Sequence, residues 1–178
     1  GESNIEITEM NLENLKEIYF AGGCFWGVEE YFSRIPGVYD AVSGYANGNT
    51  EQPTYEELPN TTGFAETVRV RYDPAVVSLR VLTGQYFKII DPVSFNRQGN
   101  DRGTQYRTGI FYTQEKDRSS IQPVMNEIQN DYSEPLAVEL APLENFYPAE
   151  DYHQDYLQKN PGGYCHIDFS SLEDLIVR

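Results

Sequence analysis

Two hydrophobic periodicities alternate along this chain, and Gly or Pro stands at most of the points where one replaces the other. Alternating, β-branched and aromatic runs predict strands, whereas apolar residues three and four positions apart predict helices. The predicted strands cover residues 16–21, 38–46, 64–72, 107–113 and 137–143, and the predicted helices cover residues 24–32, 78–90, 114–132 and 149–158. Because the two kinds of segment alternate without an internal repeat, we expect a single α/β (α+β) domain with one mixed β-sheet flanked by helices.

The segments outside this pattern are polar or rich in Gly and Pro. Residues 1–15 are polar and acidic and predict a flexible N-terminal arm, so the folded domain is expected to span residues 16–178. Pro123 lies inside a predicted helix and should kink or break it, because proline lacks an amide hydrogen and its ring clashes with the preceding turn. From Pro161 onward we expect an irregular C-terminal segment. Polar loops are expected at residues 50–63 and 94–105.

Acidic residues outnumber basic ones: 28 Asp and Glu against 13 Lys and Arg give a formal net charge of −15. This charge argues against nucleic acid and anionic membranes as partners, since both are bound through Lys and Arg. No apolar run approaches the roughly 18 residues of a membrane span, and no signal peptide is visible. We therefore expect a soluble monomer in the cytoplasm, or at the cell envelope if a leader or anchor preceded Gly1.

Cys24 follows Gly22-Gly23 and precedes a predicted helix, so we expect it at a strand-to-helix turn. The positive end of a helix dipole favours the thiolate, which is the nucleophilic form of cysteine. Phe25 and Trp26 come next and could form an aromatic wall that holds a small apolar group, such as a methyl, against the sulfur. The alternatives are an inert, buried cysteine and ordinary core packing of the two rings.

Other chemistries have less support in the sequence. Cys24, Cys165, His153 and His166 could supply four zinc ligands by number, but their spacing does not resemble a structural site, and we expect no metal. A Cys–His pair of protease type stays open, although His153 falls on a predicted helix and is expected to pack at the surface. The chain contains neither a Cys-x-x-Cys pair nor a Gly-rich nucleotide fingerprint, so no flavin or nicotinamide cofactor is expected.

Five motifs in order along the chain resemble those of the A-type peptide methionine sulfoxide reductases. They are Gly23-Cys24-Phe25-Trp26-Gly27, then Gly44-Tyr45-Ala46-Asn47-Gly48 with Pro53-Thr54-Tyr55, then Thr62-Gly63-Phe64-Ala65-Glu66, then the stretch from Asn96 to Arg107, and finally the stretches from Glu150 to Leu157 and from Lys159 to Cys165. The last stretch is similar to that of members fused to a B-type reductase domain. One departure is Phe64, which stands where the family usually has His.

The resemblance implies a thiol-dependent reduction of methionine S-sulfoxide, free or in proteins, to methionine. In the family pattern Cys24 attacks the sulfoxide sulfur and Glu66 protonates the oxygen, which requires an apolar pocket that raises the pKa of Glu66. Tyr55 and Tyr106 match phenols that hydrogen-bond the oxygen. Asp101 matches a polar residue near the site, although a role as a loop-ordering turn residue stays open.

The resemblance also implies how the substrate is held and how the enzyme is recycled. Phe25 and Trp26 match the wall that binds the methyl group. Cys24 would be left as a sulfenic acid, which Cys165 would resolve as a disulfide, and thioredoxin or a similar dithiol protein would reduce that disulfide. Phe64 would make the surroundings of Glu66 more apolar than His does.

Two other functions remain open on the sequence alone. One is a different thiol enzyme, such as a peroxidase, which turnover of peroxide without turnover of sulfoxide would establish. The other is a non-catalytic domain that binds methionine sulfoxide peptides, which would form no disulfide after exposure to them.

Overall fold

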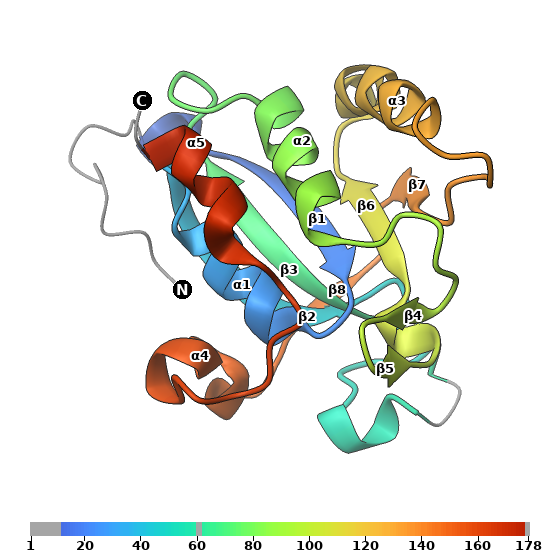
Figure 1. Cartoon of the computed structure of the whole chain (residues 1–178). Coiled ribbons are helices and arrows are strands. Elements are labelled where there is room, and N and C mark those ends of the chain that lie inside the picture. The colour runs from blue at the N-terminus through green and yellow to red at the C-terminus, as the bar shows by residue number, and fades with distance from the viewer. Residues whose placement is uncertain (1–11, 60–61, 177–178) are drawn as a thin grey trace.

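The computed structural model describes residues 12–59 and 62–176 and forms one α/β domain (Figure 1). Most of the predicted arm, residues 1–11, therefore lies outside the described residues. The strands of the main sheet are β1 (Lys16–Gly22), β2 (Val38–Ala46), β3 (Ala65–Tyr72), β6 (Thr108–Tyr112), β7 (Glu139–Pro142) and β8 (Phe146–Pro148). The longer helices are α1 (Phe25–Ser33), α2 (Leu79–Ile89) and α3 (Glu115–Gln129).

The main sheet has the strand order β7-β6-β1-β3-β2-β8. All neighbours pair antiparallel except β6 and β7, which pair parallel, so the prediction of one mixed sheet is confirmed. In the pair of β2 and β3, Tyr45 lies opposite Glu66. Successive residues of a strand face opposite sides of a sheet, so this register decides which side receives the Glu66 side chain.

The side of the sheet that faces the helices carries the main core. Ile18 and Phe20 of β1 and Val68 and Val70 of β3 form one buried apolar cluster with side chains from α1, α2 and α3. The ring of Phe20 stacks on Phe32 at 4.6 Å between centroids. A smaller cluster on the opposite side contains Tyr19, Ala21, Ala46, Ala65 and Phe111.

The sequence made two specific predictions about helices, a cap at Ser78 and a disruption at Pro123. Ser78 caps α2, because its hydroxyl accepts a hydrogen bond of 3.1 Å from the Val81 amide. Of the two expected effects of Pro123, a kink or a break, the break does not occur, since α3 is continuous from Glu115 to Gln129. Because proline has no amide hydrogen, the carbonyl of Ser119 lacks its usual helical hydrogen bond. Ser119 and Pro123 are both exposed, so water can satisfy this carbonyl.

The predicted helix over residues 149–158 is also wrong. The chain instead forms a turn of 3₁₀ helix at Asp151–His153 and only one short helix, α4 (Tyr156–Lys159). Two features prevent a continuous helix. Asp155 has a left-handed backbone with φ of 54°, and the Gln154 side chain hydrogen-bonds both the amide and the carbonyl of Ser43 at 3.0 and 2.9 Å. Gln154 thus continues the edge pairing of β2 beyond β8, which is a tertiary contact that overrides local propensity.

Three segments expected to be irregular contain short elements. The loop at residues 50–63 includes a 3₁₀ turn at Tyr55–Glu57, and the loop at residues 94–105 includes a hairpin of β4 (Arg97–Gln98) and β5 (Asp101–Arg102). A further 3₁₀ turn at Thr104–Tyr106 leads into β6. The C-terminal segment ends in a 3₁₀ turn at Phe169–Leu172 followed by α5 (Glu173–Ile176), where Asp168 accepts a hydrogen bond of 2.9 Å from the Ser170 amide.

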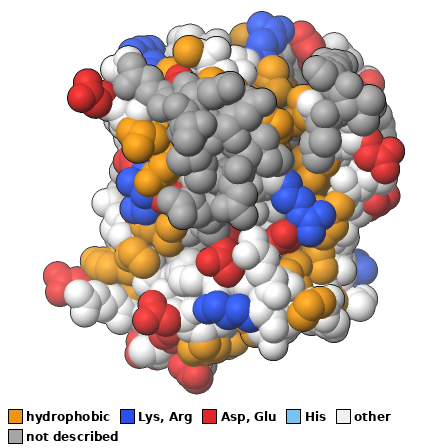
Figure 2. All heavy atoms as spheres, turned by 90° about the vertical axis from the view of Figure 1, so that its left-hand side faces the viewer, with side chains coloured by type: hydrophobic (Ala, Val, Ile, Leu, Met, Phe, Trp, Pro, Cys, Tyr) orange, Lys and Arg blue, Asp and Glu red, His pale blue; other side chains and the backbone are white. Residues whose placement is uncertain are grey.

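Charged side chains of both signs are interspersed on the face of the molecule shown in Figure 2, with apolar side chains between them. The excess of acidic residues is therefore not gathered into one patch on the described part of that face. Among residues 12–59 and 62–176, no helix has the length and apolar character needed to cross a lipid bilayer.

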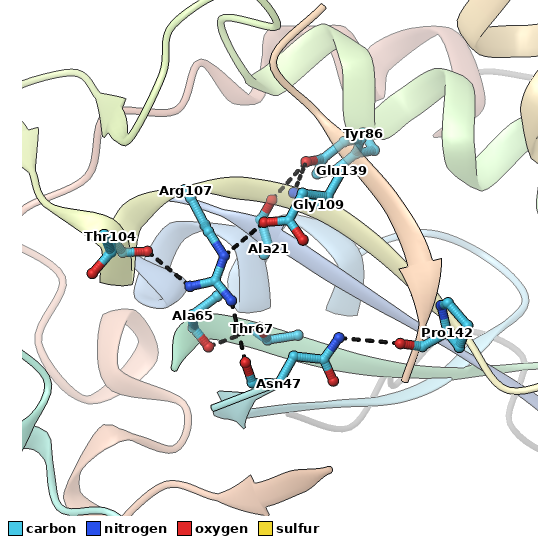
Figure 3. Close-up of polar contacts among 10 residues, drawn as sticks. All are labelled: Ala21, Asn47, Ala65, Thr67, Tyr86, Thr104, Arg107, Gly109, Glu139 and Pro142. Atoms are coloured by element: carbon cyan, nitrogen blue, oxygen red, sulfur yellow. Dashed lines mark hydrogen bonds and ion pairs between the residues drawn. The ribbon is translucent and has the colours of Figure 1, made fainter. Parts of the chain in front are cut away.

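Tyr86 of α2 joins the helix layer to the centre of the sheet (Figure 3). Its hydroxyl donates a hydrogen bond of 2.6 Å to the Ala21 carbonyl and accepts one of 3.1 Å from the Gly109 amide. Ala21 and Gly109 lie opposite each other in the pairing of β1 with β6. The Tyr86 side chain is fully buried, so without the hydroxyl both backbone groups would lose this partner out of reach of water.

We expect Tyr86→Phe to lower the free energy of unfolding by about 1–3 kcal/mol, the cost of leaving buried hydrogen-bonding groups unsatisfied. Urea unfolding followed by tryptophan fluorescence measures this change. Tyr132→Phe is the matched control, because Tyr132 is an exposed tyrosine after α3, and it should change stability by less than about 0.5 kcal/mol. Equal stability of the two variants would contradict the structural role of the Tyr86 hydroxyl.

Candidate functional site

The turn between β1 and α1 brings Cys24 to the N-terminus of a helix, as the sequence predicted. Cys24 is the N-cap residue of α1. Gly23 has a φ of 86°, and a Cβ at this position would lie 2.6 Å from the Cβ of Gln98, so both the backbone conformation and the close approach of β4 require glycine there. The chain therefore turns sharply and presents Cys24 on the side of the sheet that faces the helices.

Glu66 lies on β3 beneath this turn and is only 1% exposed. Its Oε1 accepts a hydrogen bond of 3.2 Å from the backbone amide of Phe25, the first residue of α1. Its Oε2 has no partner among the described residues. Burial raises the pKa of Glu66 to about 8, and the negative charge of Asp101 acts in the same direction. The carboxyl group is therefore largely protonated at neutral pH, which agrees with the expectation of an apolar pocket.

The Cys24 thiol is also buried, and its pKa is raised well above the usual range of a cysteine. Burial is the main cause, followed by the negative charge of Glu66, while the amide of Trp26 acts in the opposite direction. The helix N-terminus thus acts as the sequence predicted, because the Trp26 amide favours the thiolate, but burial has the larger opposite effect on the pKa of Cys24.

Tyr55 and Tyr106 come from the two 3₁₀ turns and meet beside Glu66. Their hydroxyl groups hydrogen-bond each other. Burial raises the pKa of Tyr55 to about 12 and raises that of Tyr106 further, and Glu66 contributes to both shifts. Both phenols are therefore neutral donors at neutral pH.

The position of Tyr106 is fixed by the next residue, Arg107 (Figure 3). Its guanidinium donates to the carbonyl of Thr104 at 3.0 Å and to the carbonyl of Asn47 at 3.4 Å, and it pairs with the carboxylate of Glu139 at 2.8 Å. Arg107 thereby ties the turn that carries Tyr106 to the end of β2 and to the edge strand β7.

The two aromatic residues after Cys24 occupy different environments. Phe25 is fully buried, and its ring lies 6.4 Å from the ring of Tyr55. Trp26 is half-buried and stacks on Tyr156 of α4 at 3.8 Å. Its indole nitrogen donates a hydrogen bond of 2.9 Å to Nδ1 of His153. The prediction that His153 packs at the surface is wrong, since it is 0% exposed.

Asp101 and Cys165 complete the set that the sequence singled out. Asp101 hydrogen-bonds Tyr164, its Oδ2 has no partner among the described residues, and burial raises its pKa. Cys165 is a half-buried free thiol, as Cys24 is a buried one. Its Sγ lies 2.7 Å from the place that a Cβ on Gly27 would occupy, so it rests against α1 three residues after Cys24. The two cysteines are close enough for the charge of one to raise the pKa of the other.

Sequence reasoning did not assign roles to several residues that hold this site together. Glu150 accepts hydrogen bonds from the Tyr45 hydroxyl at 2.6 Å and from the Tyr55 amide at 3.2 Å, which fixes the turn that carries Tyr55. One motif of the resemblance, the stretch from Glu150 to Leu157, contains Glu150, His153 and Tyr156. The number of polar and aromatic residues in that stretch could have indicated their role. Phe64 is fully buried, lies over Gly48 and meets the Tyr147 ring edge-on, so it adds apolar surface next to β3.

The arrangement brings together a buried thiol, a buried carboxyl whose pKa is raised, and two half-buried phenols. Such a set can deliver protons to an oxygen atom while the sulfur attacks the atom that carries it. Within residues 12–59 and 62–176, no group of three or more His, Cys, Asp or Glu side chains is arranged to hold a metal ion.

Comparison with known proteins agrees with this geometry. The family model described as peptide methionine sulfoxide reductase matches residues 16–178. The peptide methionine sulfoxide reductase MsrA of Clostridium botulinum is 55% identical over 154 residues, which are 86% of this chain and 98% of that protein. The crystal structure of Mxr1 from Saccharomyces cerevisiae in reduced form matches with a TM-score of 0.82 and 39% identity, over 88% of this chain and 91% of that chain.

A second structure of the yeast protein, Mxr1 in complex with Trx2, matches with a TM-score of 0.59 and 30% identity, over 83% of this chain and 88% of that chain. The chain therefore spans most of the length of each of these relatives. The family match over nearly the whole described chain, together with the Clostridium relative, shows that this chain belongs to the peptide methionine sulfoxide reductase family and is an oxidoreductase of the MsrA type.

Proposed function

We propose that Cys24 reduces the S epimer of methionine sulfoxide, free or in proteins, and that Glu66 is the acid of this reaction. The observation that carries the proposal is the shared burial of Cys24 and Glu66 at the β1–α1 turn, which leaves both groups protonated in the resting site. An uncharged, buried site of this kind suits a neutral sulfoxide better than a charged substrate.

In the first step, the sulfur of Cys24 attacks the sulfur of the substrate, and the sulfoxide oxygen takes a proton from Glu66. The thiol proton of Cys24 restores the proton on Glu66, so the pair begins and ends neutral. The hydroxyl then passes from the substrate sulfur to the sulfur of Cys24, so that the substrate S–O bond and the S–S bond formed by the attack both break, and methionine leaves. Cys24 is oxidised to a sulfenic acid, and the substrate sulfur is reduced by two electrons.

The surrounding aromatic residues bind the substrate in one orientation. Tyr55 and Tyr106 donate hydrogen bonds to the oxygen without adding charge, and Asp101 lies near enough to both for its charge to raise their pKa values. Phe25 and Trp26 receive the methyl group, and the bond from the Trp26 indole to His153 limits rotation of that wall. Since the sulfoxide sulfur is chiral, fixed places for the oxygen and the methyl group admit one epimer.

In the second step, Cys165 resolves the sulfenic acid. Its position against Gly27, beside the helix that begins at Cys24, supports this pairing. The resulting disulfide is reduced by thioredoxin, and the yeast relative whose crystal structure contains Trx2 supports a partner of this kind.

An assay with methionine S-sulfoxide and dithiothreitol, following methionine release, tests the proposed activity. We expect turnover of the S epimer and background consumption of the R epimer. Cys24→Ser keeps the shape of the site and removes the soft nucleophile, so its activity should fall to background while its circular dichroism stays unchanged. Normal turnover by this variant, or equal consumption of the two epimers, would refute the proposal. Turnover of peroxide alone would indicate a different thiol enzyme.

The role of Glu66 predicts the pH dependence of the first step. An acid with a pKa of about 8 is lost as the pH rises through 8, so single-turnover methionine release should be flat below pH 8 and fall above it. Glu66→Gln keeps the size of the side chain but cannot release a proton. We expect it to slow this step about 10²–10⁴-fold and to lose the decline near pH 8. An unchanged rate in quench-flow experiments would exclude Glu66 as the acid.

Replacement of the second cysteine separates reduction from recycling. Cys165→Ser should release one methionine per enzyme at the normal rate and then stop as a sulfenic acid that dimedone can trap. The unmodified enzyme should instead lose both free thiols after one equivalent of substrate. Counting thiols and methionine after a single turnover measures both outcomes. Full thioredoxin-driven turnover by Cys165→Ser would mean that Cys165 does not resolve the intermediate.

A further inference from the structure

One face of α1 lies along the C-terminal segment of the chain. Gly27, Tyr31 and Arg34 follow each other at spacings of four and three residues, so they share one face of the helix and its C-cap. Their contacts in the C-terminal segment are, in the same order, Cys165, Ser171 and Phe169. The segment therefore follows this face along the helix, with Cys165 at the end where α1 begins.

Of these three residues, only Gly27 lacks a side chain, and the Cys165 thiol occupies the space above it. A Cβ on Gly27 would lie 2.7 Å from Sγ of Cys165 and 3.0 Å from Cδ1 of Ile167. The Ile167 amide also donates a hydrogen bond of 3.4 Å to this sulfur, and the Ile167 side chain is buried in the main core. The thiol is thus held between the bare backbone of Gly27 and a residue that packing fixes in place.

Neither helix formation nor backbone conformation requires glycine at position 27. Glycine weakens a helix relative to alanine, because its backbone loses more freedom on folding. Gly27 also does not have the positive φ that favours glycine at Gly23. Gly84 of α2 is a useful comparison, since a Cβ there would meet no other part of the described chain within 4 Å beyond its own helix. The close approach of Cys165 and Ile167 is therefore the physical reason for glycine at position 27.

This position lies one helical turn from Cys24. Three residues of helix advance by about 4.5 Å along the axis, and a disulfide needs Cα atoms within roughly 4.4–6.8 Å of each other. A Cβ on Gly27 would push Sγ of Cys165 away from the helix by several tenths of an ångström, because a contact of 2.7 Å is shorter than real Cβ atoms show. Such a shift matters, since misplacement of a reacting group by about 1 Å can slow a step about 10²-fold.

We propose that Gly27 is a positioning residue for the disulfide-forming step, an inference that rests on the proposed resolving role of Cys165. The missing side chain leaves the place in which the Cys165 thiol is held within one turn of Cys24. In this step the sulfur of Cys165 bonds to the sulfur of Cys24, and the S–O bond of the sulfenic acid breaks. The hydroxyl leaves as water with the thiol proton of Cys165, so the Cys165 sulfur is oxidised and the Cys24 sulfur is reduced. A side chain at position 27 displaces the thiol and slows this step, whereas reduction of the substrate does not use Cys165 and continues.

Two variants of the full chain test this role by kinetics. Gly27→Ala adds a Cβ beneath the Cys165 thiol, and Gly84→Ala is the matched control, because it makes the same change in a helix with open space around it. After one equivalent of methionine S-sulfoxide, quench-flow sampling measures methionine release, and dimedone in the same samples measures the decay of the sulfenic acid. We expect Gly27→Ala to release methionine within about twofold of the unmodified rate but to form the disulfide about 10–10²-fold more slowly. Gly84→Ala should match the unmodified enzyme in both steps.

The ratio of the two rates separates positioning of Cys165 from a general disturbance of the site. A destabilised or distorted enzyme would lose methionine release and disulfide formation together, whereas displacement of Cys165 slows the second step alone. A normal rate of disulfide formation in Gly27→Ala, or an equal loss of both steps, would overturn the proposal.

A double-mutant cycle in thermal unfolding tests the contact itself, without any enzymatic step. Cys165→Ala removes the sulfur that a Cβ on Gly27 would meet, so Gly27→Ala should shift the Tm more favourably in the Cys165→Ala chain than in the unmodified chain. The shift caused by Gly84→Ala should be the same in both chains. Equal shifts for Gly27→Ala in the two chains, or failure of this variant to fold in both, would show that the Cys165 thiol is not what requires glycine at position 27.

Failure of the proposed function gives a different result. Full thioredoxin-driven turnover by Cys165→Ser would refute the resolving role of Cys165, and it would do so whatever the rates of the Gly27 variant. If Cys165→Ser stops after one methionine while Gly27→Ala forms its disulfide at the normal rate, only the role of Gly27 is refuted.

Discussion

The hydrogen bond from the Phe25 amide to the carboxyl of Glu66 joins the first turn of α1 to the centre of the sheet. A helix N-terminus leaves amide groups without partners, and here one of them is satisfied by a side chain from β3 instead of a local cap. Cys24 offers no side-chain cap of its own. The same contact that anchors the helix therefore places the carboxyl group beside the thiol. The second carboxyl oxygen of Glu66 has no partner in the part of the chain that the structure describes.

Burial then determines the protonation of this pair. In water the pKa of a thiol is about four units above that of a carboxyl group, so at neutral pH the carboxyl group would lose its proton while most of the thiol would keep it. Inside the domain each negative charge would have to exist without water and close to the other. Burial therefore raises the pKa of both groups, and in the proposed mechanism they supply the protons that the sulfoxide oxygen takes up. Tyr55 and Tyr106 extend this uncharged donor set without adding another group that ionises near neutral pH.

The parts of the site come from distant segments that a few polar contacts hold in place. Glu150 fixes the turn of Tyr55, Arg107 fixes the turn of Tyr106, and His153 fixes the ring of Trp26. The C-terminal segment lies along the start of α1, where Cys165 contacts Gly27 and His166 contacts Gly22. In the proposed function, the thiol that reduces the substrate and the thiol that resolves the intermediate therefore lie within one turn of α1, and only a short shift of the C-terminal segment is needed to join them.

The sequence by itself determined the strands β1, β2, β3 and β6, the helices α1 and α2, and the turn that carries Cys24, because alternation, helical spacing and Gly or Pro ends are local properties. It also identified the eight side chains that the structure gathers around that turn, through motifs whose residues need not be neighbours in the chain. Only the tertiary structure decided the remainder. Gln154 pairs with β2 and prevents a helix over residues 149–158, and exposure of Pro123 lets α3 continue through it. The raised pKa of Cys24 and the burial of His153 depend on which distant atoms exclude water, and no local pattern encodes that exclusion.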